Sequence, residues 1–247
     1  MSRLVVVGFG MGPQHLTDEA RAALGGTDYV IAFRKGPDDP LLAVRREICG
    51  LFGLDLVEID DPERDRADPV DYPAAVRAWH RARVDAVADV LRSRDGGAAF
   101  LVWGDPSLYD STLRLVQQVA AVLPTLTWTA VAGISAPSLL AARHRIVLHE
   151  VGEPVHVTPA RHLREAIVSG QRSIVAMLCS SATFDALEAH PRWRIWWGAN
   201  LGAPSERLLA GRVVDVLPEI VAARAAAKAE AGWVMDSFLL RPPGGER

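Results

Sequence analysis

Three glycines follow a short apolar run near the start of the chain, in a pattern that could bind a nucleotide phosphate, another ligand or nothing. The run VVVGFGMGPQHLT, residues 5–17, contains Gly8, Gly10 and Gly12. Dinucleotide binding requires G-x-G-x-x-G and an acid about 20 residues later, but Pro13 replaces the third glycine and the next apolar run ends in Phe-Arg-Lys. The string G-x-x-x-x-G-K-[ST] is absent from the sequence. Both phosphate interpretations therefore fail, and a tight turn that needs glycine stays open beside a turn that contacts some other ligand.

Two further small-residue turns are predicted at the carboxyl ends of strands. LVWGDPSLYDST covers residues 101–112, and VAGISAPS covers residues 131–138. Ligands of open parallel sheets bind at the carboxyl ends of the strands, where such turns converge. Turns of this kind offer main-chain amides and carbonyls more than charged side chains, which suits a flat adenine with a polar amino-acid tail. Chance convergence is the alternative, because every doubly wound fold has such turns.

Alternating strands and helices must position these turns. The expected strands lie at 4–7, 29–33, 54–59, 98–103 and 127–131, and the expected helices at 16–24, 75–92 and 111–122. This alternation predicts a parallel sheet with helices on both faces. After residue 149 the expected elements are helices at 160–168 and 219–230, strands at 173–178, 194–197 and 233–240, and a hairpin or edge piece at 213–216. We therefore expect an α/β protein of two α/β domains, at residues 1–148 and 149–247.

Composition excludes several classes of protein. The chain has 247 residues, of which 49% are hydrophobic and 23% charged, as in ordinary globular proteins. A formal net charge of −3 argues against a nucleic-acid partner. No apolar run approaches the roughly 20 residues of a membrane span, so we expect a soluble, cytoplasmic protein. Cys49 and Cys179 lie far apart in the sequence, and we expect neither a disulfide nor a zinc site.

The three turns, in this order and spacing, resemble those of the tetrapyrrole (corrin/porphyrin) methylase family, which binds S-adenosylmethionine. Five more segments resemble one subgroup of this family, from the aerobic cobalamin pathway: FRKGPDDPLLAVRREIC, GDPSLYDSTLR, LLAARHRIVLHEVGEPV, WGANLGAPSERLLAGRV and GWVMDSFLLR. The similarity extends over nearly the whole chain. It implies an N-terminal parallel-sheet domain, a C-terminal mixed-sheet domain, a cofactor cleft between them and a homodimer.

The resemblance also implies which residues contact the cofactor, largely through the main chain. These are Met11, Pro13, Gly104, Asp105, Leu108, Ser135, Ala136, Met177 and Leu178. The first turn is one residue shorter than the pattern of the family. The implied product of the cofactor is S-adenosylhomocysteine, and no metal is implied.

The implied reaction is methylation of precorrin-5 at C-1 with release of acetate, which gives precorrin-6A in cobalamin (vitamin B12) biosynthesis. Methyl transfer requires the carbon nucleophile to lie about 3–3.5 Å from the methyl group more than it requires an acid or base. Release of acetate requires water and a base. The candidate catalytic residues are Asp105, Tyr109, Asp110 and His144, with His15 as a further one. The structural alternative for Asp105 is a carboxylate that caps its loop, and for Asp110 a helix cap.

Arginines are the candidate partners of the substrate carboxylates, because a guanidinium binds a carboxylate through two parallel hydrogen bonds. Arg143 and Arg145 flank His144, and further candidates are Arg34, Lys35, Arg45 and Arg46. A solvated surface is the alternative for each of them. The tryptophans of RWRIWWG could stack on a flat ligand or pack in a core.

Three other functions stay open at this point. A methylase of the same family could act on a different corrinoid intermediate, and a corrinoid-binding protein without catalytic activity could keep the fold. A nicotinamide oxidoreductase is disfavoured by Pro13 and by the missing acid.

Overall fold

The computed structural model describes residues 2–34, 36, 39–63 and 72–243, and these form two compact units, Met1–Ile134 and Ser135–Arg247. Sequence analysis places the boundary after residue 148 instead. The difference is helix α5 (Ala136–His144), which contacts strands of the second unit rather than those of the first. No helix among the described residues is long and apolar enough to cross a membrane.

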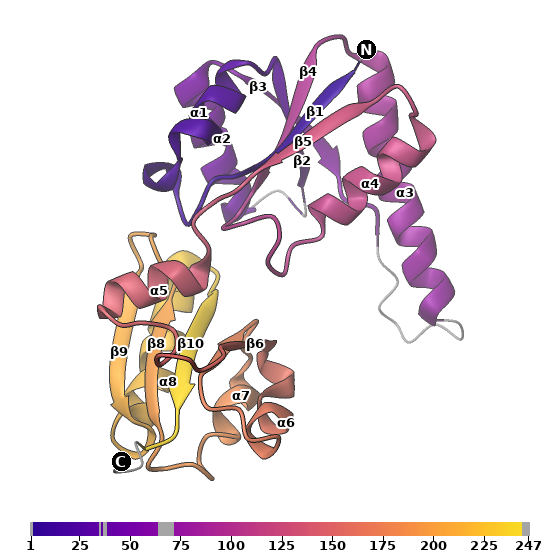
Figure 1. Cartoon of the computed structure of the whole chain (residues 1–247). Helices are drawn as coiled ribbons and strands as arrows, with labels where there is room; N and C mark the ends of the chain where they lie inside the picture. The colour runs from indigo at the N-terminus through magenta and orange to yellow at the C-terminus, as the bar shows by residue number, and fades with distance from the viewer. Residues whose placement is uncertain (1, 35, 37–38, 64–71, 244–247) are drawn as a thin grey trace. The chain divides into compact units, whose positions relative to one another are not determined.

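The first unit contains the expected parallel sheet. Its strands are β1 (Arg3–Gly8), β2 (Tyr29–Arg34), β3 (Asp55–Asp60), β4 (Gly97–Val102) and β5 (Thr127–Val131). They lie in the order β3-β2-β4-β1-β5, and every pairing is parallel (Figure 1). All carboxyl ends therefore meet at one edge, where the three small-residue turns begin.

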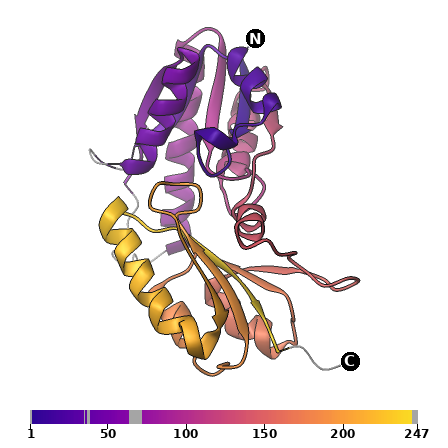
Figure 2. The same ribbon diagram turned by 90° about the vertical axis from the view of Figure 1, so that its left-hand side faces the viewer.

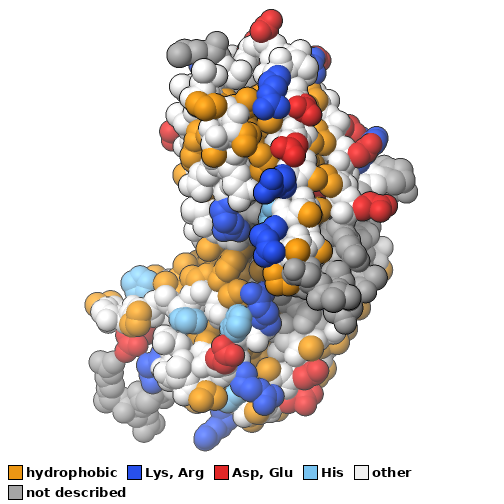
Figure 3. All heavy atoms as spheres, turned by 90° about the vertical axis from the view of Figure 1, so that its right-hand side faces the viewer, with side chains coloured by type: hydrophobic (Ala, Val, Ile, Leu, Met, Phe, Trp, Pro, Cys, Tyr) orange, Lys and Arg blue, Asp and Glu red, His pale blue; other side chains and the backbone are white. Residues whose placement is uncertain are grey.

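Helices cover both faces of this sheet. Helices α1 (Asp18–Gly25) and α2 (Pro40–Phe52) pack on the face that receives Val5 and Val7. Helices α3 (Tyr72–Ser93) and α4 (Thr112–Val122) pack on the face that receives Leu4 and Val6. The alternation of side chains along a strand sends neighbouring residues to opposite faces, so the apolar run of β1 is buried on both. Charged side chains of both signs lie over the α3 and α4 face (Figure 3).

The second unit has a mixed sheet in the order β6-β7-β10-β8-β9, as the resemblance implies. Its strands are β6 (His156–Pro159), β7 (Ile174–Met177), β8 (Arg194–Ala199), β9 (Arg207–Arg212) and β10 (Asp236–Arg241), of which only the β6–β7 pair is parallel among the described pairs. Helix α8 (Val213–Ala231), the yellow helix in Figure 2, packs on one face together with α6 (Leu163–Val168) and α7 (Ser181–Asp185). Two short 3-10 helices, Pro13–His15 and Ala160–His162, complete the described elements.

One predicted element is wrong, and several are missing from the prediction. Residues 213–216 are the first turn of α8, because Arg212 is the N-cap and its guanidinium donates two hydrogen bonds to Asp215 (2.6 and 2.9 Å). The β-branched valines of this stretch favour a strand, but the cap and the packing of Val213 decide for a helix. Sequence analysis also missed α2, α5, α7 and β9.

Candidate active site

The three turns at the carboxyl edge of the first sheet contact one another through the main chain. Gly10 and Gly104 exchange two backbone hydrogen bonds, of 3.2 and 2.7 Å. A Cβ atom on Gly133 would lie 2.1 Å from the carbonyl oxygen of Gly104 and 2.8 Å from the carbonyl carbon of Gly8. Three strand ends therefore meet at a distance that side chains would prevent, and Gly8 and Gly133 are required for that reason.

Asp105 links two of these turns. Its Oδ2 accepts a hydrogen bond from the amide of Gly133 (3.0 Å), and its Oδ1 accepts one from the amide of Ser107 (2.8 Å) and another from the Ser107 hydroxyl. Burial raises the pKa of Asp105, but these hydrogen bonds outweigh burial and hold the pKa below its usual value. These are the contacts of a carboxylate that organises a loop, and its catalytic role stays a prediction.

Two candidate catalytic residues follow Asp105: the exposed Tyr109, and Asp110 just before helix α4. Tyr109 is 39% exposed and has a φ of 53°, a left-handed conformation that is unusual for a tyrosine. Asp110 accepts a hydrogen bond from the amide of Thr112 (2.6 Å) at the beginning of α4. Asp110 precedes Ser111, the N-cap of α4, so this contact forms a local turn at the helix start, while its Oδ2 makes no hydrogen bond with another described residue.

The predicted cofactor contacts of the first turn differ in exposure. The Met11 side chain is only 4% exposed, whereas Pro13 is half-buried at the start of a 3-10 helix. Gly10 and Gly12 have φ values of 69° and 152°, which require glycine. Gly104 is buried and Leu108 is half-buried on the second turn. The cofactor roles of these residues stay predictions.

In the second unit, Leu178 is held in an unusual conformation. It follows β7 directly, is 59% exposed and has a φ of 57°, while Met177 beside it is half-buried. The adjoining carbonyl of Cys179 accepts a hydrogen bond from Arg224 Nη2 (3.2 Å), and Arg224 Nε donates to the buried carboxylate of Asp236 (3.1 Å). An apolar side chain is thus presented to solvent by a turn that a buried ion pair anchors.

Asp236 is the fixed end of this anchor. Trp197 donates its indole N–H to Asp236 Oδ2 (3.0 Å), and the Trp197 side chain is completely buried. Burial raises the pKa of Asp236 despite the hydrogen bonds from Trp197 and Arg224, which lower it. Trp197 therefore packs in the core of its unit, which is the alternative to stacking on a ligand.

The remaining residues of the second unit lie on and beside α5. Ser135 is the N-cap of α5, where its hydroxyl accepts a hydrogen bond from the amide of Ser138 (3.4 Å), and Ala136 is the first helical residue. At the other end, His144 Nε2 donates to the carbonyl of Trp197 (2.9 Å). Because a carbonyl can only accept, this bond leaves Nδ1 of the neutral ring as a proton acceptor.

Most of the candidate arginines already have acidic partners. Arg143 Nε contacts Glu206 (3.0 Å), and Arg145 ends α5 in a left-handed conformation. Arg34 pairs with Asp60 (2.6 Å) and Arg46 with Glu58 (2.7 Å). Lys35 lies outside the described residues. Arg45 differs, because both of its described hydrogen bonds go to backbone carbonyls.

The described residues contain neither a reactive thiol nor a group of side chains that could bind a metal ion. Cys49 and Cys179 are free, and burial raises the pKa of the Cys49 thiol to about 11 and that of Cys179 well above its usual value. Thiols of this kind are inert because the thiolate is the nucleophile. Among the described residues, no three His, Cys, Asp or Glu side chains form a group that could hold a metal ion.

The residues of the three turns fit S-adenosylmethionine better than a nucleotide phosphate. Residues 8–16, 103–112 and 132–138 contain no lysine or arginine, and the charged side chains among them are only Asp105 and Asp110. An ionised carboxylate beside exposed main chain suits a ligand whose sulfonium and ammonium groups are cationic. A pyrophosphate would instead be repelled by these two carboxylates, and no basic side chain of the turns would offset the repulsion.

We predict that Gly133→Ala will destabilise the first unit. The new methyl group meets only backbone atoms, which cannot rotate away, so we expect the free energy of unfolding to fall by on the order of 3 kcal/mol. Gly50→Ala is the matched control, since its Cβ meets nothing within 4 Å on an exposed face of α2 and alanine stabilises a helix by about 1 kcal/mol. Urea unfolding followed by circular dichroism compares the two. Equal stability of both variants would show that the turns do not pack as described.

We predict that Asp105 stabilises the fold in a pH-dependent way. Because its pKa is lowered in the folded state, its contribution is present above the unfolded pKa of about 3.9 and is lost as the pH falls through the folded pKa. Asp105→Asn should therefore cost about 1–3 kcal/mol at pH 7 and distinctly less at pH 3. Urea unfolding at both pH values measures this difference. A cost that does not change with pH would contradict the ionised, hydrogen-bonded carboxylate.

Comparison with known proteins agrees with this geometry. Residues 3–217 match the family of tetrapyrrole (corrin/porphyrin) methylases. The chain is 38% identical over 252 residues to a precorrin-6A synthase (deacetylating) of a Sinorhizobium species, and the match covers 98% of this chain and 95% of that protein.

Solved structures share the fold. A cobalamin synthesis related protein (CobF) of Corynebacterium diphtheriae superimposes with a TM-score of 0.84 at 32% identity, over 99% of this chain and 100% of that one. The cobalt precorrin-4 methyltransferase CbiF superimposes with a TM-score of 0.67 at 13% identity, over 97% and 94%, and this likeness concerns the fold alone. With the converging turns, the parallel sheet and the mixed sheet all in place, the chain belongs to the tetrapyrrole methylases and is a methyltransferase.

Proposed function

We propose that this chain methylates precorrin-5 at C-1 with release of acetate and forms precorrin-6A, with S-adenosylmethionine as the methyl donor. The observation that carries this proposal is 38% identity to a precorrin-6A synthase (deacetylating) over 98% of the chain. The turns that the resemblance assigns to the cofactor are built as main-chain contacts at the carboxyl edge of the parallel sheet. A corrinoid-binding protein of this fold would keep the same turns, so turnover is what separates it from the proposed enzyme.

When bound, S-adenosylmethionine supplies a methyl group on a cationic sulfur. The residues that would hold it are those of the three turns, with Gly104, Asp105 and Leu108 at their centre, and Met177 and Leu178 of the second unit. Asp105 acts by keeping the turns of β4 and β5 together and by adding a negative charge. Met11 and Pro13, with Ser135 and Ala136, complete the proposed set.

We assign the base that activates water to His144. Its Nε2 is engaged by the carbonyl of Trp197 (2.9 Å), so its Nδ1 can take a proton from water that attacks the acetyl carbonyl. The carboxylate of Asp105 is less suited, because both of its oxygens already accept hydrogen bonds. Tyr109 and Asp110 are proposed to face the substrate, as are Arg143 and Arg145. We further propose that the enzyme acts in the cytoplasm and, as the family resemblance implies, as a homodimer.

The reaction is tested with purified protein, precorrin-5 and methyl-labelled S-adenosylmethionine. We expect label in the macrocycle and free acetate to appear in equal amounts during one time course. Label without acetate would identify a methylase that acts on another corrinoid intermediate. Neither product, in a protein that binds S-adenosylhomocysteine, would identify a corrinoid-binding protein without this activity.

His144→Gln tests the proposed base. Removal of a general base lowers a rate by about 10²- to 10⁴-fold, so acetate release should fall within that range while the dissociation constant of S-adenosylhomocysteine stays unchanged. His162→Gln is the matched control, because the His162 side chain is 45% exposed and its described polar partners are Glu165 and Arg161. Acetate release at the wild-type rate by His144→Gln would remove His144 from the mechanism.

A further inference from the structure

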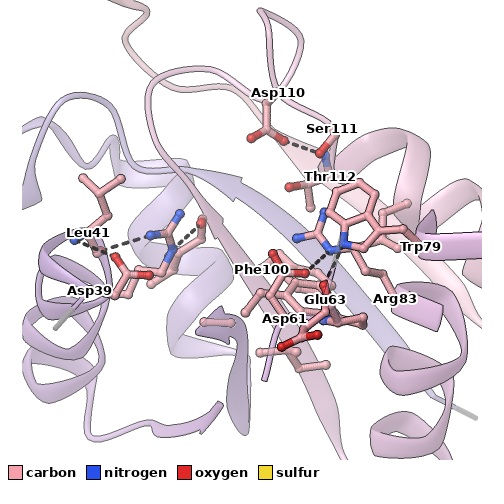
Figure 4. A pocket seen from close by; sticks show the side chains of 17 residues that line it. Asp39, Leu41, Asp61, Glu63, Trp79, Arg83, Phe100, Asp110, Ser111 and Thr112 are labelled. Atoms are coloured by element: carbon pink, nitrogen blue, oxygen red, sulfur yellow. Dashed lines mark hydrogen bonds and ion pairs between the residues drawn. The ribbon is translucent and has the colours of Figure 1, made fainter. Parts of the chain in front are cut away.

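A cavity of about 960 Å³ lies within the first unit, beside the turn that follows β4. It is lined by the carboxyl-terminal parts of β2 and β4, by the N-terminal ends of α2 and α4, and by one side of α3. Figure 4 shows Asp39 and Leu41 at one side of this cavity, and Trp79 and Arg83 at the other. A cavity of this volume holds a group of the size of a small molecule.

Arg45 enters this cavity without an acidic partner. Its Nε donates to the carbonyl of Leu101 (3.1 Å) and its Nη1 to that of Leu41 (3.0 Å). Among the described residues, no carboxylate lies within ion-pair distance of Arg45, and its Nη2 has no hydrogen-bond partner. Burial lowers the pKa of Arg45, while Asp39 and Asp110 raise it in part. An anion in the cavity would thus meet the Arg45 guanidinium, which forms no ion pair with a described residue.

Three of the four acids that line the cavity have partners of their own, and the fourth is the exposed Glu63. Asp39 accepts hydrogen bonds from the amides of Leu41 (3.0 Å) and Leu42 (3.2 Å) as the N-cap of α2, and Asp110 accepts one from Thr112. Asp61 lies 3.0 Å from Arg83 Nε. Helix N-termini compensate negative charge at two of these acids, and a guanidinium does so at the third.

Arg83 provides a second cation on the opposite wall. Its guanidinium lies 4.0 Å from the ring centre of Phe33 and 4.7 Å from that of Trp79. Stacking between two aromatic rings fixes the guanidinium plane. The rings of Phe33 and Trp79, together with Phe100 and Leu115, form an apolar part of the cavity wall beside the two guanidinium groups. The cavity therefore joins apolar surface to cationic groups, which suits a short aliphatic arm that ends in a carboxylate.

We propose that this cavity is a subsite for one carboxylate-bearing side chain of the tetrapyrrole substrate, with Arg45 as its main partner and Arg83 as its second. The proposal rests on the proposed function for the identity of the substrate. Arg45 Nη2 donates to the carboxylate, and the methylene carbons of the arm lie against Phe33 and Phe100. The subsite fixes the orientation of the macrocycle, so it acts on substrate affinity and not on the binding of S-adenosylmethionine.

Arg45→Gln tests the subsite in the full-length enzyme. A hydrogen bond to a charged group contributes a factor of about 10–100 in affinity, so KM for precorrin-5 should rise within that range while kcat changes little. Arg45→Lys, which keeps the charge, should recover part of the loss. Arg92→Gln removes the same charge from an exposed ion pair with Asp89 on α3 and should leave KM unchanged.

Two binding measurements separate the subsite from a structural role and from the proposed function. S-adenosylhomocysteine should bind wild type and Arg45→Gln equally, and uroporphyrin, a stable porphyrin with eight carboxylate arms, should bind Arg45→Gln more weakly. Equal uroporphyrin affinity, or an equal loss of affinity for both ligands, would overturn the subsite. Selective loss of uroporphyrin binding in an enzyme that does not turn over precorrin-5 would support the subsite and overturn the proposed function.

Discussion

The contact of main chain with main chain at Gly8, Gly104 and Gly133 is the constraint on which the first unit depends. The parallel sheet brings the ends of β1, β4 and β5 side by side, and the absence of Cβ atoms lets the following turns touch. The exchange of hydrogen bonds between Gly10 and Gly104 then satisfies backbone groups that would otherwise need water or a ligand.

Each unit uses a carboxylate to hold a turn that follows a parallel strand, but the environments differ. Asp105 in the first unit accepts hydrogen bonds from Ser107 of its own loop and from Gly133 of the β5 turn, and they lower its pKa despite burial. Asp236 in the second unit lies in an apolar core, where burial raises its pKa although Trp197 and Arg224 contact it. Asp236 also helps to hold a turn that it does not contact. Arg224 donates from Nε to Asp236 and from Nη2 to the carbonyl of Cys179, next to Leu178. In the first unit the link is direct, because Asp105 itself accepts hydrogen bonds from the amides of Ser107 and Gly133.

Periodicity and turn composition were enough to predict the parallel sheet, its strands and the three turns. Helix α2 was missed, although Asp39 and Gly53 carry the signals of an N-cap and a left-handed C-cap. The distinct position of Arg45 could not be predicted from the sequence, because neighbouring arginines differ only in their tertiary partners. Arg34 and Arg46 meet acids of β3, and Arg45 points to a different part of the fold.

Asp110 connects the two parts of the proposed site in the first unit. Its main chain ends the turn that contains Gly104 and Asp105, and its side chain lines the cavity with Arg45 and Arg83. Burial lowers the pKa of both arginines, and the charge of Asp110 offsets part of that lowering. A carboxylate arm that binds Arg45 must therefore compete with Asp110 for the charge of the same guanidinium. On this proposal, the turns recognise the cofactor through the main chain and the cavity recognises the substrate through charge, and Asp110 belongs to both.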